Sequence, residues 1–265
     1  MSRAEPVESL EATFQRLVDN VIDAAAATRD VIDVGPFRVL ISPDSDLIYY
    51  NYAVPLRPCE NWSAVIPALC ETFEARGRVP RLEYFGMLWP TLEAALEAAG
   101  FTLELAAPVM TLTPAELLEP ASSLASILLL RADDDLATFT DFLTVGAEGF
   151  EVTLTESIEL SMQRLRPQIA NGSLIAALAR VGGESVACGS LMCTGEVAEL
   201  AGVATTPASR RQGIAADLCA VLLRKGFEAG ITLSWLSAAS AGARALYEGL
   251  GLTQVGAQMH YSRKL

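Results

Sequence analysis

Histidine is nearly missing from this chain, since His260 is the only one among its 265 residues. Triads built on histidine and metal centres rich in histidine both depend on imidazole groups. The scarcity therefore argues against either kind of site, and we expect no bound metal. His260 falls in the last apolar stretch of the sequence, where we predict a packing or edge position on a strand.

Cysteines and long apolar runs are also scarce. The five cysteines are odd in number and lack the CxxC spacing of zinc sites, which predicts reduced, buried thiols. No apolar run reaches the roughly 18 residues that a membrane helix needs. The first residues lack the apolar core of a signal peptide. We expect a cytoplasmic protein with no membrane partner.

Basic residues are too few for a nucleic-acid partner. The chain has 19 Lys and Arg against 32 Asp and Glu, a formal net charge of −13. Proteins that bind nucleic acid present a basic face, so this balance argues against that class. An acidic surface suits a cationic amine ligand, and it also serves solubility alone. With 51% hydrophobic residues, the chain has ample material for one large domain or two moderate ones.

The segment from Arg210 to Ala215 contains the clearest chemical signal. An apolar strand pattern from Glu199 to Thr206 stops at Pro207, and a helical pattern runs from Ala215 to Phe227. A strand that turns through a glycine into a helix presents free backbone N–H groups and the positive end of the helix dipole. The sequence therefore predicts an anion site, large enough for a pyrophosphate, in which Gly213 permits close approach.

This segment resembles motif A of the GNAT superfamily of acyl-CoA-dependent N-acyltransferases, Gln/Arg-x-x-Gly-x-Gly/Ala. A second segment, Ala243 to Leu252, resembles motif B of the same superfamily. Ser240 stands where motif B usually has Asn, and Leu252 stands where it usually has Phe. The resemblance implies an α+β fold, with a mixed, mostly antiparallel sheet flanked by helices.

The resemblance also implies the reaction. The chain would transfer an acetyl group from acetyl-CoA to a primary amine by direct attack in a ternary complex. Tyr247 would protonate the departing thiolate, and Glu199 would take a proton from the amine. A bulge in the strand before the loop would open a slot for pantetheine. The expected coenzyme A contacts are Val203, Ala204, Thr205, Arg210, Arg211, Gln212, Gly213, Ile214, Ala215 and Ser240.

The acceptor and the oligomeric state stay open at this point. The acceptor is a small-molecule or peptide amine, and the protein is a monomer or a homodimer. Phe142, Phe150, Glu151 and Glu156 are placed by position alone as candidates for the acceptor pocket. Alternatives are a non-catalytic acyl-CoA-binding regulatory module, a tandem acetyltransferase like mycothiol synthase, and a purely structural interaction protein.

The first half of the chain resembles a shortened copy of the second. A shift of 151 positions places Gly100 on Gly251 and Leu96 on Tyr247, with the same order of strand, helix and strand. The copy lacks the glycine loop and the tyrosine. We therefore predict a degenerate, non-catalytic GNAT-like lobe at 1–113, a linker at 114–124 and a catalytic lobe at 125–265. An unrelated small α+β domain is the alternative for the first half.

The remaining element predictions follow the apolar patterns. In the first half they are strands within 35–56 and at 81–85, a helix at 62–76, a helix at 92–99 and hairpin-like strands within 102–112. In the second half they are a strand at 127–132, a helix to about Gly149 capped by an Asp of 133–135, a helix at 154–170, a hairpin over 173–193, and the strand, helix and strand at 231–236, 241–250 and 252–263.

Overall fold

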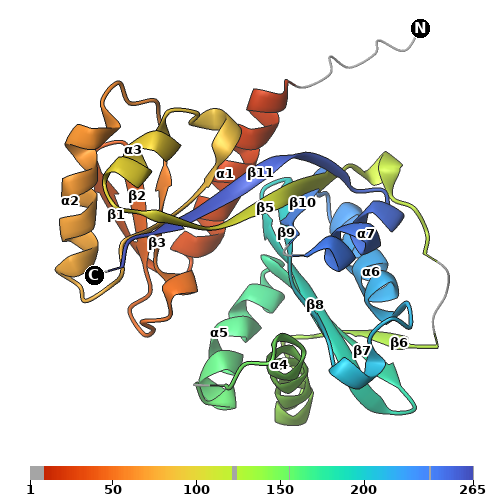
Figure 1. Ribbon diagram of the computed structural model, residues 1–265. Helices are drawn as coiled ribbons and strands as arrows, with labels where there is room; N and C mark the ends of the chain where they lie inside the picture. Colours follow the sequence, from red (N-terminus) through yellow and green to blue (C-terminus); the bar gives the residue numbers. More distant parts are fainter. Residues whose placement is uncertain (1–8, 121–123, 155, 239, 265) are drawn as a thin grey trace, which may run out of the picture. The chain divides into compact units, whose positions relative to one another are not determined.

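The computed structural model describes residues 9–120, 124–154, 156–238 and 240–264. By its internal contacts the chain divides into two compact units (Figure 1). Unit 1 comprises Met1–Val109 and Gln254–Leu265, and unit 2 comprises Met110–Thr253. Each unit is a sheet covered by helices, which confirms the predicted mixed α+β class.

Unit 1 contains the strands and helices predicted for the first half of the chain, apart from the hairpin within 102–112. Its sheet has the order β1-β2-β3-β4-β11-β5, in which β1 with β2, β2 with β3 and β4 with β11 are antiparallel pairs and β3 with β4 is a parallel pair. The elements are α1 (Leu10–Ala26), β1 (Asp30–Val34), β2 (Phe37–Ile41), η1 (Ile48–Tyr50), β3 (Tyr52–Pro55), α2 (Trp62–Glu74), β4 (Arg81–Phe85), η2 (Gly86–Leu88), α3 (Leu92–Ala98), β5 (Thr102–Leu112) and β11 (Thr253–Ser262).

The first helix and strand of unit 1 were not predicted. The α1 helix begins after Ser9, whose hydroxyl accepts the N–H of Ala12. It packs on the sheet through Phe14, whose ring lies 5.2 Å from that of Phe85. Apolar residues at helical spacing were the available signal, and the repeat comparison did not extend that far.

The solitary histidine belongs to a buried ionic cluster on β4, β5 and β11. Arg81, 2% exposed, pairs with Glu83 and lies 2.9 Å from Glu104. His260 lies opposite Glu83 in the strand register, with its Nδ1 3.1 Å from Arg81 Nη2. Each buried charge in this cluster therefore has an opposite charge beside it, as burial demands. The predicted strand position of His260 is confirmed.

Unit 2 has the sheet order β10-β9-β8-β7-β6. The α6 helix packs on one face of this sheet and α4 on the other. The elements are η3 (Pro114–Glu116), β6 (Ser126–Leu129), α4 (Leu136–Phe150), α5 (Ile158–Ala170), β7 (Leu174–Val181), β8 (Glu184–Thr194), β9 (Val197–Thr205), η4 (Pro207–Ser209), α6 (Ile214–Glu228), β10 (Leu233–Ser237) and α7 (Ala241–Gly249).

Residues close to the ends of helices and strands predicted most of those ends in unit 2. Asp135 caps α4 by accepting the N–H of Thr138 at 2.9 Å, as predicted. Gly182 and Gly183 both have positive φ, which suits the tight turn between β7 and β8. The predicted start of α5 at Leu154 was wrong. The helix begins after Ser157, whose hydroxyl accepts the N–H of Leu160. Thr155 and linker residues 121–123 lie outside the described residues.

The segment 102–112 was predicted as two strands and is one. It forms the single strand β5, which runs through Pro108 without a turn. Its last residues, Met110 and Leu112, lie in the core of unit 2. The terminal strand β11 pairs with β4 and contributes the buried Tyr261 to the core of unit 1. Each half of the chain therefore supplies a terminal strand that ends in the other unit. The predicted lobes at 1–113 and 125–265, with a linker at 114–124, remain a hypothesis.

A glycine at the end of α7 permits a close approach within unit 2. Gly251 has φ +95°, and a Cβ there would lie 2.1 Å from the carbonyl oxygen of Glu116. The N–H of Leu118 bonds to the carbonyl of Leu250 at 3.0 Å. The segment around η3 is thus held against the turn that follows α7.

We predict that Gly251→Ala destabilises the protein by about 3 kcal/mol or more, because steric overlap adds to left-handed backbone strain. Chemical denaturation measures the loss. Gly249→Ala is the control, since a Cβ there meets nothing within 4 Å. That variant is expected to match or slightly exceed the parent in stability. Equal stability of both variants would contradict the packing seen at Gly251.

Candidate functional site

Two parallel strands in unit 2 separate part of the way along. The β9 and β10 strands pair through Val197, Ala198 and Glu199, with Trp235 as the last partner on β10. Beyond that point β9 continues to Thr205 and β10 to Ser237, and the described residues of these two strands make no further pairs with each other. Parallel strands normally continue their ladder of hydrogen bonds. This break in the ladder between β9 and β10 is called the opening below.

A bulge marks β9 where it has left β10. In the register with β8, Ser190 lies opposite Ala201 and Cys188 opposite Ala204. Two residues of β9, Gly202 and Val203, therefore stand opposite Gly189 alone. Gly202 has φ +63°, a conformation that glycine adopts readily. The bulge predicted for this strand is present.

The helix after β9 begins without a side-chain cap. Gly213 is the N-cap of α6 with φ +79°, and as a glycine it offers no side chain to cap the first turn. Five other helices of the described chain, α1, α2, α4, α5 and α7, each begin with a side chain that accepts an N–H of the first turn. Arg211 also has positive φ, at +63°. Such alternation turns consecutive N–H groups toward one side and forms an anion-binding concavity.

The N–H groups from Arg211 to Ala215 make no backbone hydrogen bond within the described part of the chain. The first N–H that bonds back is that of Ala216, to the carbonyl of Gly213. Arg211, Gln212 and Gly213 are exposed, so an anion in water can reach them. Uncapped donors at the positive end of a 15-residue helix fit a pyrophosphate.

The side chain of Arg210 contacts its own protein and does not reach over this loop. Its Nη2 donates to the carbonyl of Gly149 at 2.8 Å and its Nε to the carbonyl of Thr205 at 3.2 Å. It also pairs with Glu151 at 3.3 Å. Arg210 thereby ties the end of α4 to the end of β9, next to the glycine loop.

Tyr247 is buried on α7, in the same core as α6. Burial, together with the nearby thiol of Cys219, raises the pKa of Tyr247 above its ordinary value. Burial also raises the pKa of Cys219 to about 12. Both groups therefore hold their protons at neutral pH, and Tyr247 is available as a proton donor.

Glu199 lies at the point where β9 and β10 separate, and it is half-buried. Its neighbours Ala198 and Leu200 pack in the core on the α6 face. Side chains alternate along a strand, so Glu199 points to the opposite face, the one that α4 covers. Tyr247 and Glu199 are therefore on opposite faces of the sheet.

The other predicted contact residues lie on β9, in the loop before α6 and at the start of α7. Val203, Ala204 and Thr205 belong to the part of β9 that is not paired with β10, and Ile214 is buried at the start of α6. Gln212 donates to the carbonyl of Ala208 at 3.3 Å. Ser240 caps α7, since its hydroxyl accepts the N–H of Ala243 at 3.2 Å. The structure gives Ser240 that local role in helix formation.

The four pocket candidates do not form one group. Phe142 points from α4 into the core that this helix covers, and Phe150, at the end of α4, is 55% exposed. Glu151 pairs with Arg210, whereas Glu156 pairs with Arg164 and accepts from the hydroxyl of Ser161. A shared acceptor pocket built from these residues remains a hypothesis.

Three residues near the bulge were missed by the sequence analysis. A Cβ on Gly149 would lie 2.8 Å from the Cβ of Ala204, so this glycine lets α4 approach β9 closely. Ser190 and Cys188 donate to carbonyl groups of the bulge. No motif covers these positions, and only the pairing of β8 with β9 brings them to the site.

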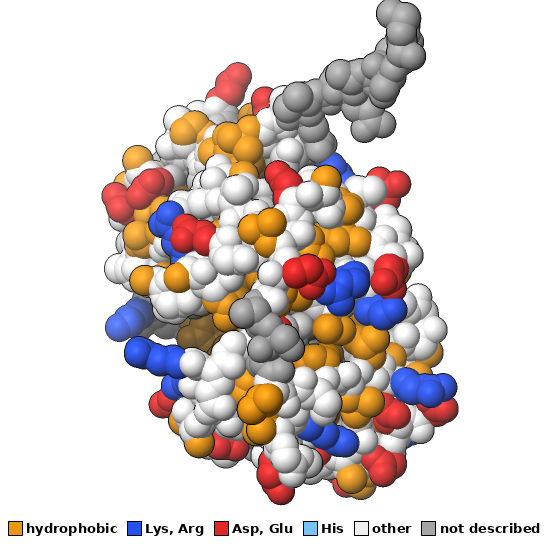
Figure 2. Space-filling view, turned by 90° about the vertical axis from the view of Figure 1, so that its right-hand side faces the viewer, with side chains coloured by type: hydrophobic (Ala, Val, Ile, Leu, Met, Phe, Trp, Pro, Cys, Tyr) orange, Lys and Arg blue, Asp and Glu red, His pale blue; other side chains and the backbone are white. Residues whose placement is uncertain are grey.

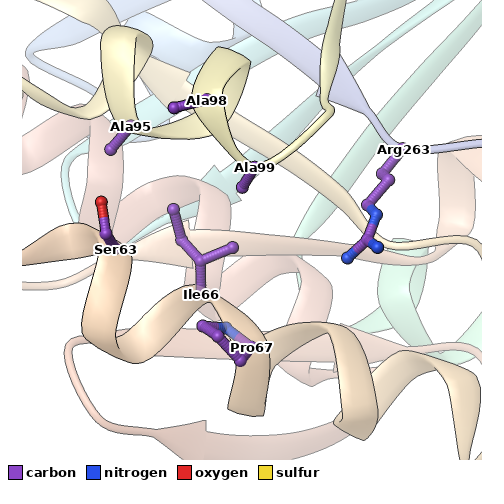
Figure 3. A pocket seen from close by; sticks show the side chains of 7 residues that line it. All are labelled: Ser63, Ile66, Pro67, Ala95, Ala98, Ala99 and Arg263. Atoms are coloured by element: carbon purple, nitrogen blue, oxygen red, sulfur yellow. The ribbon is translucent and has the colours of Figure 1, made fainter.

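Unit 1 contains a separate hollow of about 300 Å³ between α2 and α3. Small and apolar residues line it, and the guanidinium group of Arg263 points toward the same space (Figure 3). Arg263 also donates to the sulfur of Cys70 at 3.3 Å. Its lining offers one cation and no carboxylate. The lining residues are Ser63, Ile66, Pro67, Ala95, Ala98, Ala99 and Arg263.

Two further observations concern other kinds of site. In the described ranges, no group of three or more His, Cys, Asp and Glu side chains is placed to hold a metal ion. Among the helices that are described, none is both long and apolar enough to cross a membrane.

Comparisons with known proteins agree with this geometry. The acetyltransferase (GNAT) family model matches residues 147–252, the span that holds the bulge, the glycine loop and Tyr247. A search of curated proteins gave no match. Among solved structures, a GCN5-related N-acetyltransferase from Kribbella flavida has a TM-score of 0.79 at 22% identity, covering 95% of this chain and 96% of that one.

Two further structures have the same fold. A GCN5-related N-acetyltransferase from Sphaerobacter thermophilus gives a TM-score of 0.64 at 15% identity, covering 88% of this chain and 82% of that one. A tandem GNAT protein from the clavulanic acid biosynthesis pathway gives 0.59 at 11%, covering 85% and 77%. The chain therefore carries a domain of the GNAT acetyltransferase family at residues 147–252, on a fold that is consistent with a tandem arrangement.

Proposed function

We propose that unit 2 is an acyl-CoA-dependent N-acyltransferase that moves an acetyl group from acetyl-CoA to a primary amine. The observation that carries the proposal is the separation of β9 from β10 beside an uncapped helix N-terminus. A phosphate-binding loop at one end of an open strand edge suits a long ligand that has a pyrophosphate at one end and amide groups along its arm.

The backbone supplies the contacts for such a ligand. The N–H groups of Arg211 to Ala215 bind the pyrophosphate, with Arg211 and Gln212 adding side-chain donors at the rim. Polar backbone groups of Val203, Ala204 and Thr205 bind the pantetheine amides along the free edge of β9. Arg210 holds the end of β9 in place through the carbonyl of Thr205, and Ser240 fixes the start of the helix that carries Tyr247.

Acetyl-CoA brings a thioester carbonyl, which is the electrophile of the reaction. Glu199 accepts a proton from the ammonium group of the acceptor, directly or through water, so that the neutral nitrogen attacks the carbonyl carbon. A backbone N–H of the bulge donates to the carbonyl oxygen as negative charge develops there. Tyr247 gives its proton to sulfur when the carbon–sulfur bond breaks. The products are an amide and free coenzyme A.

The acceptor and the setting belong to the same proposal. We assign a small-molecule or peptide amine as acceptor, a cytoplasmic location and no nucleic-acid partner. On the face drawn in Figure 2, acidic and basic side chains are interspersed among uncharged and hydrophobic ones. With a net charge of −13, such a surface suits an encounter with a cationic amine better than one with a polyanion.

Unit 1 is proposed as a non-catalytic copy. The 151-position shift places Trp62 on Gly213, at the start of the equivalent helix. Trp62 is buried against Phe37 and Trp89, and its indole donates to Thr91 at 3.0 Å. Asn61 caps that helix by accepting the N–H of Ala64. The place of the anion loop is thus occupied by the unit's own side chains.

Replacing Gly213 tests the phosphate-binding loop. Gly213→Val should weaken acetyl-CoA binding at least tenfold, about 1.4 kcal/mol, because a branched side chain blocks the donors and opposes positive φ. Isothermal titration calorimetry measures the change. Gly230→Val is the control, since Gly230 also has positive φ, lies beyond the other end of α6 and has no atom within 4 Å of its Cβ position. Equal binding by Gly213→Val and the parent would show that the loop is misassigned.

Removing one hydroxyl tests the proton donor. Tyr247→Phe should lower kcat by roughly 10²-fold while leaving acetyl-CoA affinity nearly unchanged, because packing is kept and only the proton is lost. Thiol release in the presence of an accepted amine measures kcat. Tyr84→Phe removes another buried phenol, whose oxygen has no hydrogen-bond partner among the described residues, and should leave kcat as it is. A kcat unchanged by Tyr247→Phe would mean that water protonates the sulfur.

Stoichiometry tests the assignment of unit 1. Calorimetry of the full chain with acetyl-CoA should give one site per polypeptide, because Trp62 and Asn61 occupy the start of α2. Gly213→Val, by contrast, should reduce that single site to weak binding. Two sites per chain in the parent would overturn the non-binding role of unit 1.

A further inference from the structure

We propose that Ser190 and Cys188, two side chains of β8, position the bulge of β9 so that its N–H groups face the acyl group. Both are positioning residues that act through the backbone and touch no substrate. The inference rests on the proposed function, because it concerns how the acyl carbonyl is held at the opening between β9 and β10.

The two side chains bond to consecutive carbonyl groups of the bulge. Ser190 Oγ donates to the carbonyl oxygen of Ala201 at 3.2 Å. Cys188 Sγ donates to the carbonyl oxygen of Gly202 at 3.8 Å, within range for sulfur. A bulge interrupts the regular ladder, so carbonyl groups at such a place need other partners. Here β8 supplies them from its side chains.

Because the peptide group is planar, fixing the direction of these two carbonyl groups also fixes the direction of the N–H groups that follow them. A trans peptide is planar, and its C=O and N–H point in opposite directions. Holding the carbonyl of Ala201 toward β8 therefore turns the N–H of Gly202 away from β8. Holding the carbonyl of Gly202 does the same for the N–H of Val203. Away from β8 is the side on which β10 has separated from β9.

Packing on the same face keeps both donors in place. Cys188 is 2% exposed, and a Cβ on Gly146 of α4 would lie 3.5 Å from its sulfur. Burial raises the pKa of Cys188 to about 12, so the thiol keeps the proton that it donates. Gly202, with positive φ, has the Ser190 hydroxyl as the atom nearest to its Cβ position, at 3.8 Å. The bulge is thus held from β8 and covered by α4.

The consequence concerns the acyl oxygen alone. Donors that are already oriented stabilise negative charge on a carbonyl oxygen without reorganising during the reaction. Free coenzyme A has no acyl carbonyl and should not depend on that orientation. The ratio of the dissociation constants of acetyl-CoA and coenzyme A therefore reports the positioning separately from the rest of the site, and it does so before the acceptor amine is identified.

The experiment measures both dissociation constants by calorimetry for the parent, Ser190→Ala, Cys188→Ala and the double variant. Each single variant should weaken acetyl-CoA three- to tenfold relative to coenzyme A, the worth of one hydrogen bond, with the Kd for coenzyme A unchanged. Ser190→Thr keeps the hydroxyl and should restore the ratio of the parent. When an amine that the enzyme accepts is supplied, kcat of the Ser190→Ala and Cys188→Ala variants should fall by a larger factor than the factor by which KM changes.

Two matched controls separate positioning from stability. Ser234 Oγ donates to the carbonyl of Ala198 at 3.2 Å, the same kind of bond to the same strand at the same length, but away from the bulge. Cys193 Sγ donates to the carbonyl of Leu191 at 3.8 Å, also away from it. Ser234→Ala and Cys193→Ala should leave the ratio of dissociation constants as in the parent, even where the melting temperature falls.

Each outcome decides the question. An unchanged ratio in the double variant, or an equal loss of both ligands, overturns the positioning role while leaving the proposed function intact. A change in the ratio in the control variants likewise overturns it. Failure of the parent chain to bind acetyl-CoA and coenzyme A would overturn the proposed function and, with it, this inference.

Discussion

The separation of β9 from β10 after Glu199 is the constraint on which the candidate site depends. Pairing that continued past Trp235 would consume the polar backbone edge of β9 and close the sheet. The bulge at Gly202 lies three residues further along β9, and the uncapped start of α6 follows after Thr205 and η4. Backbone geometry, more than any single side chain, creates the place where a long, polar ligand can lie.

The two residues with proposed acid–base roles lie on opposite faces of the sheet, beside that separation. Tyr247 belongs to the α6 face, where burial keeps it protonated. Glu199 belongs to the face covered by α4, at the start of the opening. In the proposed reaction Tyr247 is the proton donor and Glu199 the proton acceptor, and their positions on opposite faces prevent a direct hydrogen bond between them. Arg210 donates to the carbonyl groups of Gly149 and Thr205, and so joins the end of α4 to the end of β9.

Local signals made much of this predictable. The glycine at 213, the proline at 207 and the apolar spacing of α6 identified the loop, and Asp135 identified the start of α4. Contacts between distant segments could not be derived in this way. Ser190 and Cys188 reach the bulge only through the pairing of β8 with β9, and Gly149 matters only because α4 packs against Ala204. The single strand β5 was mistaken for a hairpin because alternation alone does not show where a strand ends.

The exchange of terminal strands has a consequence for synthesis on the ribosome. Residues 81–85 leave the ribosome before unit 2 is made, but their partner strand β11 follows unit 2 in the sequence. Until then the sheet of unit 1 lacks Tyr261, and β4 has an exposed edge. The sheet that begins first is therefore completed only after unit 2 has been made. A nascent chain must protect that edge while residues 110–253 are translated, and a chain that stopped before β11 would leave the sheet of unit 1 incomplete.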